Sequence, residues 1–247
     1  MNPAWSLPHA GLGATVALVL ALGHLVMLVP RLDEPDAREV GADVVAVKPR
    51  YRNLVTARRV TVTAVLAVTA GAAGSAVPEP GRVLWWVWAG PVLTLVVVDQ
   101  ATTFLPVRLW RWCLAESAIA VIAWLVLAGP AVRSTTMLTT HGWAVLGWAG
   151  LGLAAAAPFW LMWRLTGGIG YGDVRLAAGV GAVSAVLGTG GWLTGLLASA
   201  LVGVLLAVGT WAVRRVRPSP WGQVFSYGPA LWLGPWIALA VSCWPGR

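Results

Sequence analysis

The chain has 247 residues, of which 58% are hydrophobic and 11% charged, and its mean hydropathy is +0.77. This composition excludes an ordinary soluble globular domain and indicates a protein embedded in lipid. A net charge of +8 would suggest nucleic-acid binding in a soluble protein, but here the basic residues fall between apolar runs, so no nucleic-acid partner is predicted. Cys113 and Cys243 lie far apart and form no CxxC pattern, which indicates neither a zinc site nor a disulfide framework.

Eight apolar segments follow one another along the chain, and each is long enough, or nearly so, for the ~20 helical residues that cross a bilayer. Prolines and glycines between the segments break them into separate helices. The predicted fold is therefore all-α, a polytopic membrane protein with about eight transmembrane helices. We divide the chain into residues 1–59, a first span with a short charged cytoplasmic loop, and residues 60–247, a membrane-embedded core. The predicted spans are residues 11–29, 60–77, 83–98, 114–128, 142–163, 174–187, 192–213 and 227–244.

Basic residues predict how these spans are oriented. If the N-terminus lies outside, four loops lie in the cytoplasm, and they hold 14 of the chain's 17 basic residues. Such a bias is the usual signature of the cytoplasmic side, and shifting the count by one helix would destroy it. These loops comprise residues 30–59, 99–113, 164–175 and 214–226.

Small and aromatic residues give further hints about packing. In the segment 192–213, small residues recur at every fourth position, which predicts that another helix packs closely along that face. The four residues are Gly195, Ser199, Gly203 and Ala207. Tryptophans near segment ends, such as Trp85 and Trp112, are typical of anchors at the membrane interface.

Three acidic residues lie near membrane depth, namely Asp99, Glu116 and Asp173. Asp99 ends the third span and Asp173 opens the sixth, so the predicted topology places both at the inner ends of their helices. Two carboxylates at equal depth in a bundle can meet, and a close pair tends to share one proton. One then activates water while the other polarises a peptide carbonyl, which is the chemistry of an aspartyl protease. An alternative for the same pair is a relay in a proton- or ion-coupled transporter.

The residues beside the two aspartates suit a protease better than a relay at mid-membrane. Gly170 and Gly172 leave room for an extended substrate and permit backbone angles closed to other residues. Leu105 and Pro106 end the inner extension of the third span. The three histidines show no metal-ligand spacing, so no metal is predicted.

Three motifs resemble those of the type IV prepilin leader peptidases, a family of GxGD-type membrane aspartyl proteases. "GYGDVRL", residues 170–176, resembles the GxGDxKL signature, and "DQATTFLP", residues 99–106, resembles the first-aspartate motif. "FSYGPALWLG", residues 225–234, is similar to the C-terminal FGPxLxxG element. The motifs occur in the order found in the family.

The resemblance implies an endopeptidase that cleaves the short cytosolic leader of type IV prepilins or of the pseudopilins of protein secretion. It implies that Asp99 and Asp173 are catalytic, and that Gly228 and Pro229 belong to the substrate-binding loops with Gly170, Gly172, Leu105 and Pro106. Arg175 stands where the family has lysine. No cofactor is implied. The implied location is the bacterial cytoplasmic (inner) membrane, as a multi-pass protein whose core, 60–247, is the peptidase, with the leader peptide and membrane lipid as partners.

Two features remain outside the shared motifs. Bifunctional members of the family carry a cytosolic domain with CxxC motifs after the first span, associated with methylation, whereas residues 30–59 here contain no cysteine. N-methyltransferase activity is therefore not expected. The basic cluster of this segment predicts a solvated connector, a role in receiving substrate, or contact with anionic lipid. Glu116 either supports the catalytic region or turns its carboxylate toward the membrane surface.

Overall fold

The computed structural model describes residues 7–35, 42–79, 81–127, 135–217 and 225–244, and these residues form helices and turns with no strand. Six helical segments are long and apolar enough to cross a membrane. They are Leu7–Arg31, Ala57–Ala76, Arg82–Thr102, Val107–Val126, His141–Thr166 and Gly188–Val216. The all-α class and the membrane character are confirmed, while the total of eight spans and their orientation stay predictions.

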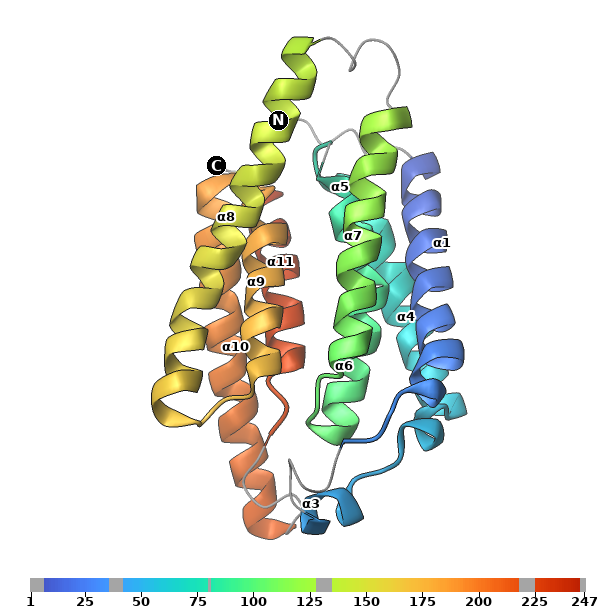
Figure 1. The fold of residues 1–247 in the computed structure, drawn as a ribbon, viewed down its shortest axis with the longest axis vertical. Helices are drawn as coiled ribbons and strands as arrows, with labels where there is room; N and C mark the ends of the chain where they lie inside the picture. The colour runs from blue at the N-terminus through green and yellow to red at the C-terminus, as the bar shows by residue number, and fades with distance from the viewer. Residues whose placement is uncertain (1–6, 36–41, 80, 128–134, 218–224, 245–247) are drawn as a thin grey trace.

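The remaining two predicted spans correspond to shorter helices, α9 (Tyr171–Ala185) and α11 (Gly228–Ser242). Both are 15 residues long, short of the ~20 that cross a bilayer without help. They run alongside the long helices inside the bundle (Figure 1), packed against α10 (Gly188–Val216). Neighbouring helices pack against both of them, α8, α10 and α11 against α9, and α6, α9 and α10 against α11.

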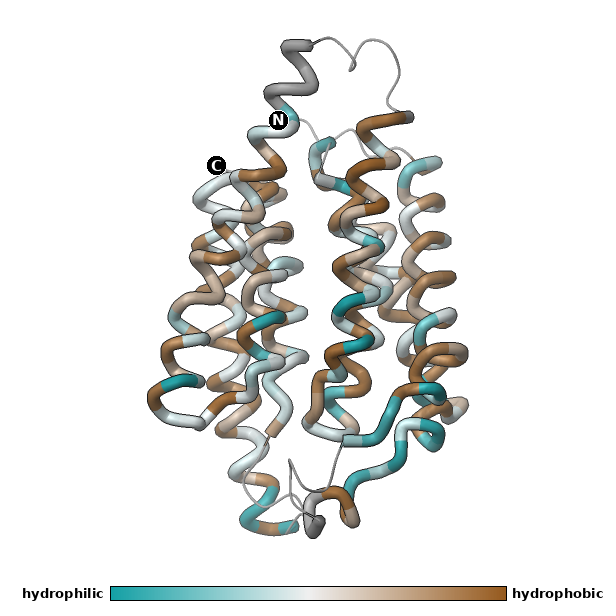
Figure 2. The backbone as a smooth tube through the Cα atoms, in the orientation of Figure 1, coloured by the Kyte–Doolittle hydropathy of each residue, from teal (hydrophilic) through white to brown (hydrophobic). Residues whose placement is uncertain are grey.

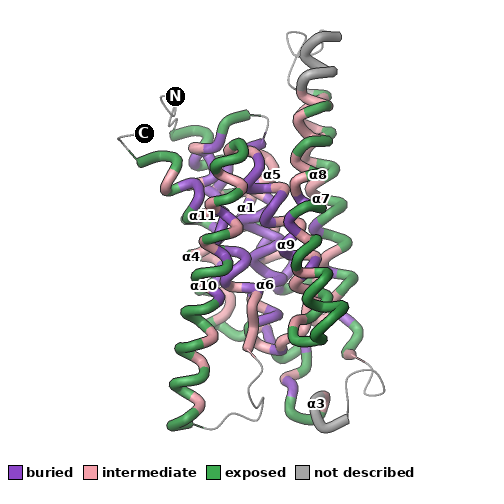
Figure 3. The backbone as a smooth tube through the Cα atoms, turned by 90° about the vertical axis from the view of Figure 1, so that its left-hand side faces the viewer, coloured by how far each residue is buried: buried purple, intermediate pink, exposed green. Residues whose placement is uncertain are grey.

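The helices form two groups that stand side by side (Figure 1). One group contains α1 (Leu7–Gly23), α4 (Ala57–Ala73), α5 (Arg82–Ala89), α6 (Pro91–Thr102) and α7 (Val107–Leu127), and the other contains α8 (Thr135–Thr166) to α11. Contacts of α6 with α11 and of α5 with α9 join the groups. The central helices are the most buried, as Figure 3 shows, and the apolar faces of the outer helices are exposed, as expected in lipid.

The third predicted span is broken in the middle. α5 ends at Ala89 and α6 begins at Pro91, because Pro91 has no N–H for a continuous helix and fits the first turn of a new one. A side chain at Gly90 would meet the backbone of Ala17 at 2.8 Å, so this break is also where α1 approaches closely. The two half-helices place Asp99 near the end of α6.

Two tryptophans of α5 hold the groups together. Trp88 and Trp232 each donate the indole N–H to the other's backbone carbonyl, at 3.1 and 2.9 Å. Trp85 is fully buried and donates to the carbonyl of Val183 at 3.1 Å. The prediction of Trp85 as an interfacial anchor is therefore wrong, because its ring and its N–H are both used inside the bundle. Trp112 is exposed, in keeping with an anchor at the interface.

One end of the bundle collects the loops predicted to be cytoplasmic. The segment between α1 and α4, the turn after α6 and the α8–α9 connection lie there together (Figure 1). Figure 2 shows hydrophilic residues concentrated at the same end and hydrophobic residues along the helices. The opposite end holds the start of α1 and the end of α11.

Cysteine labelling in intact cells tests the orientation. Single cysteines at Arg108, Arg164 and Arg214, in a chain without its two native cysteines, are expected to react only with membrane-permeant reagents, because the basic loops stay in the cytoplasm. Arg133, predicted to be outside, falls beyond the described residues, and a cysteine there is expected to react from outside. Labelling of position 164 by an impermeant reagent would overturn the arrangement.

Candidate active site

Asp99 and Asp173 line one cavity of about 950 Å³. The two residues are 74 positions apart in the sequence, and their helices belong to the two different groups. Packing of α6 against α11, and of α11 against α9, brings these two residues together.

Asp99 is held in a fixed place near the end of α6. Its side chain is buried, and its Oδ2 accepts hydrogen bonds from the Ser226 hydroxyl and, at 3.0 Å, from the Gly228 N–H. Gly228 is the first residue of α11, so the carboxylate lies at the positive end of that helix. These contacts orient one oxygen and offset part of the cost of burying the acid.

The position after Asp99 is a sharp turn. The Thr103 N–H donates to the Asp99 carbonyl at 2.6 Å, which closes α6. Thr103 has φ of 58°, and among the described residues it is the one non-glycine residue with positive φ. A β-branched residue in this conformation is strained and is retained only where the surroundings hold it. The turn directs Thr103, Phe104 and Leu105 into the cavity wall.

Asp173 caps the helix that it opens. It is the third residue of α9, where its Oδ2 accepts the Gly170 N–H at 3.1 Å and its own N–H donates to the Gly170 carbonyl at 3.0 Å. The carboxylate contact is one half of a capping box, and it satisfies the Gly170 N–H at the helix start; the other half is replaced by a backbone bond, because glycine has no side chain. The cap uses Oδ2, and the second carboxylate oxygen takes no part in it.

The glycine motif and the Leu-Pro motif contact each other. A side chain on Gly172 would lie 2.6 Å from the Cβ of Leu105, so only glycine permits this approach. Gly170, Gly172 and Leu105 all line the cavity beside the aspartates. The structure thus joins the two sequence motifs that carry the acids.

Other predicted site residues lie outside the cavity wall. The Arg175 guanidinium stacks on the Tyr171 ring at 4.6 Å, Pro106 precedes α7, and Pro229 is in the first turn of α11. Gly228 contacts Asp99 through its backbone N–H. Glu116 is on α7, where its Oε1 lies 2.7 Å from His24 Nε2 of the π-helix that follows α1, His24–Leu28. The structure therefore pairs Glu116 with His24, and it brings Asp99, Asp173, Gly170, Gly172 and Leu105 together.

Several residues of the site were missed in the sequence. Ser226 was inside a quoted motif, but nothing in that motif indicated a bond to Asp99. Tyr227 lines the cavity, and its ring fills the space where a side chain on Gly203 of α10 would lie. Phe159 and Met162 of α8 complete the apolar wall. Among the described residues, no three His, Cys, Asp or Glu side chains gather as metal ligands.

This fold and this site define a helical integral membrane protein with two carboxylates in a shared cavity. The chain is similar to a Pseudomonas aeruginosa protein named prepilin leader peptidase/N-methyltransferase, with 40% identity over 93 residues, 35% of this chain and 29% of that protein. A protein of the same name from Stutzerimonas stutzeri is 29% identical over 168 residues, 65% of this chain and 50% of that protein. The chain thus spans half or less of each relative. The relatives confirm the predicted resemblance to the prepilin leader peptidase family.

No protein-family model matches the chain, and no solved structure matches it. The family resemblance therefore depends on the two relatives and on the three motifs.

Proposed function

We propose that this protein is an intramembrane aspartyl endopeptidase that removes the short cytosolic leader from type IV prepilins or related pseudopilins. The observation that carries the proposal is the presence of Asp99 and Asp173 in one cavity. The names of the two relatives support the same substrate class. The site of action is the cytoplasmic membrane of a bacterium, with membrane lipid around the helices.

The proposed reaction is direct attack of water on the scissile carbonyl. One carboxylate, ionised, takes a proton from the water, and the other, protonated, donates a hydrogen bond to the carbonyl oxygen. The tetrahedral intermediate collapses as the C–N bond breaks, and the departing nitrogen takes up the proton that the base accepted from water. Two acids that cannot both be charged at short range supply this combination of base and acid.

The cavity wall suits an extended peptide. Gly170 and Gly172 keep the wall beside Asp173 free of side chains, which leaves room for a substrate strand. The aromatic rings of Phe104, Phe159 and Tyr227 provide apolar surface around the bond to be cleaved. Ser226 and Gly228 keep Asp99 in place while substrate enters.

A proton or ion relay in a transporter is the other use of paired intramembrane acids. It is not favoured, because both relatives are named as peptidases. The end of α6, which carries Asp99, and the start of α9, which carries Asp173, also lie toward the end of the bundle with the loops (Figure 1). Transporter sites, in contrast, lie near the bilayer midplane.

The direct test uses the purified protein in detergent with a candidate prepilin. Mass spectrometry is expected to find a single new N-terminus at the junction between the leader and the apolar segment. An intact prepilin, under conditions in which a known prepilin peptidase cleaves it, would argue against the assignment.

The cleaved product is expected to stay unmethylated. The segment between α1 and α4 contains no cysteine, so it lacks the CxxC motifs associated with methylation in bifunctional members. When this protein is the only enzyme and a methyl donor is present, the product N-terminus should retain the mass of a free amine. A gain of one methyl group would contradict this prediction.

A further inference from the structure

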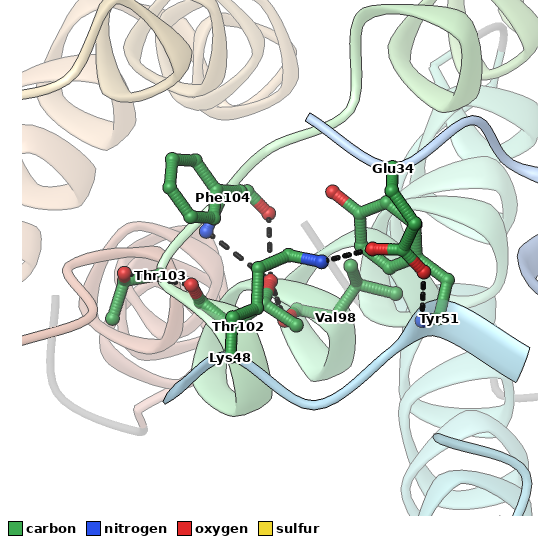
Figure 4. Close-up of polar contacts among 7 residues, drawn as sticks. All are labelled: Glu34, Lys48, Tyr51, Val98, Thr102, Thr103 and Phe104. Atoms are coloured by element: carbon green, nitrogen blue, oxygen red, sulfur yellow. Dashed lines mark hydrogen bonds and ion pairs between the residues drawn. The ribbon is translucent and has the colours of Figure 1, made fainter. Parts of the chain in front are cut away.

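A buried ion pair ties together the segment that connects α1 to α4. Lys48, the one lysine of the chain, has a side chain only 1% exposed and pairs with Glu34. The other Glu34 oxygen accepts the backbone N–H of Tyr51 at 2.7 Å, and the Lys48 ammonium lies 3.9 Å from the centre of the Tyr51 ring (Figure 4). We call these three residues the Lys48 cluster. A lysine is almost never buried so fully unless its charge is paired.

The Lys48 cluster is anchored in the hydrophobic core of the protein. Tyr51 and Leu54 belong to the short helix η3 (Tyr51–Leu54), are 2% and 0% exposed, and are part of the same hydrophobic cluster as Val98 of α6. The helix η3 contacts α6 directly and also contacts η2 (Val29–Arg31), the continuation of α1. The connecting segment is therefore packed against the end of α6.

The end of α6 is the part of the fold that positions Asp99. Figure 4 shows the Lys48 cluster beside the turn formed by Thr102, Thr103 and Phe104. The Thr102 hydroxyl donates to the Val98 carbonyl at 2.8 Å and accepts the Phe104 N–H at 3.3 Å. The strained Thr103 lies between them, so this turn needs support from its neighbours.

We propose that Lys48, through its ion pair with Glu34, is a positioning residue for Asp99 and for the cavity wall at residues 103–105. The inference rests on the proposed function for its catalytic consequence, but its structural part stands alone. The ion pair holds η3 against α6, and η3 in turn supports the turn that follows Asp99. Neither Lys48 nor Glu34 lines the cavity, so their effect on the reaction passes through the turn.

The consequence of losing one partner follows from the burial of Lys48. Glu34→Gln keeps an acceptor for the Tyr51 N–H but leaves the Lys48 ammonium buried without a counter-charge, which is strongly unfavourable. The segment then opens to hydrate the ammonium, and η3 withdraws from α6. Lys48→Met removes the charge, keeps much of the side-chain volume, and frees the Glu34 carboxylate, which is 38% exposed, to turn toward water.

Two readouts test the proposal, one of them independent of cleavage. The first is the rate of alkylation of a single cysteine at Phe104, in a chain whose Cys113 and Cys243 are replaced by alanine. Glu34→Gln and Lys48→Met are each expected to raise this rate about fivefold, because the turn loosens. Lys48→Arg, which keeps the charge and the contact with the ring, should stay within about twofold of the parent.

The second readout is cleavage of a short leader peptide. Both variants are expected to lower kcat about tenfold while KM changes less than about twofold, because the carboxylate is misplaced and the apolar wall still binds peptide. The double variant should be no worse than the more affected single, since both act through one pair.

Asp33→Asn is the matched control, because it removes the same charge from the residue next to Glu34. Asp33 is 95% exposed and contacts Arg108 only at 3.9 Å, so both readouts should stay unchanged. Unchanged alkylation at position 104 in Glu34→Gln and in Lys48→Met would overturn the proposal. If the parent protein cleaves no leader, the proposed function fails, while the alkylation rates still decide the positioning role.

Discussion

Asp99→Asn and Asp173→Asn are each expected to abolish leader cleavage, with a loss of at least about a thousandfold. An amide has nearly the size of the carboxyl group, but it cannot take a proton from water and does not share one with a neighbouring acid. In both variants the hydrogen bonds from Gly228 and Gly170 can still be accepted by the amide oxygen. Both proteins should therefore insert and accumulate normally. The measurement is single-turnover cleavage of a prepilin in detergent, together with the amount of folded protein.

A variant with both substitutions tests whether the two aspartates act as one catalytic unit or contribute independently to the rate. Because base and acid act in one step, Asp99→Asn with Asp173→Asn should be no slower than either single variant. Independent roles would multiply the two losses. Near wild-type cleavage by either single variant would mean that the pair is not catalytic, and the relay alternative would then gain weight.

Glu116→Gln controls for intramembrane acids in general. The Glu116 side chain meets His24 and lies outside the cavity wall, and an amide can keep a hydrogen bond to the imidazole. Substantial activity is expected to remain. Comparable losses in Glu116→Gln and Asp99→Asn would indicate that intramembrane charge, rather than the cavity pair, sustains cleavage.

The presence of Asp99 and Asp173 in one cavity could be predicted, because lipid makes an isolated acid costly. Charge bias then put both residues at one end of the bundle. Each of these signals is local in sequence or follows from simple counting. The prediction of unusual backbone angles at the glycines around Asp173 is wrong, because Gly170 is extended with φ of −76° and Gly172 is helical. At Gly172 the close approach of Leu105 is what requires glycine. The structure brings these residues together, in a cavity that also includes Leu105.

Residues that act across the bundle gave no such signal. Trp85 has the sequence context of an interfacial anchor, yet its N–H meets the Val183 carbonyl inside the protein. Whether Trp85 lies at the membrane interface or inside the bundle depends on which helix packs beside α5. Neither the periodicity nor the composition of the sequence predicts that neighbour. Ser226 is similar, because its bond to Asp99 joins residues 127 positions apart.

The Lys48 cluster could not be predicted for a related reason. A basic segment between two spans is usually solvated, and most such lysines are exposed. Here Tyr51 and Leu54 pack into the hydrophobic core beside α6, and this packing buries the neighbouring Lys48 together with its partner Glu34. The alternation of acidic and basic residues in the sequence does not reveal which pair is buried.

Gly228→Ala is expected to reduce cleavage about a hundredfold without preventing insertion. The added Cβ would lie 2.5 Å from Asp99 Oδ2, which is too close to persist without movement, and 3.2 Å from its Cγ, which is a tight contact. The Asp99 side chain is short and is held by Ser226, so relief requires rotation of the carboxylate or displacement of the start of α11. Either movement lengthens the bond from the Gly228 N–H and turns Asp99 away from Asp173.

Gly209→Ala on α10 is the matched control, since a side chain there would meet nothing within 4 Å. Alanine also favours a helix over glycine by about 1 kcal/mol, so this variant should be at least as stable as the parent and fully active. The measurement is kcat/KM on a prepilin for both variants, with thermal unfolding in detergent to exclude general loss of fold. Equal activity of Gly228→Ala and Gly209→Ala would show that the contact of α11 with Asp99 does not set the geometry of the acid. A loss confined to Gly228→Ala, with unfolding temperatures alike, would instead place the start of α11 among the parts that position the catalytic pair.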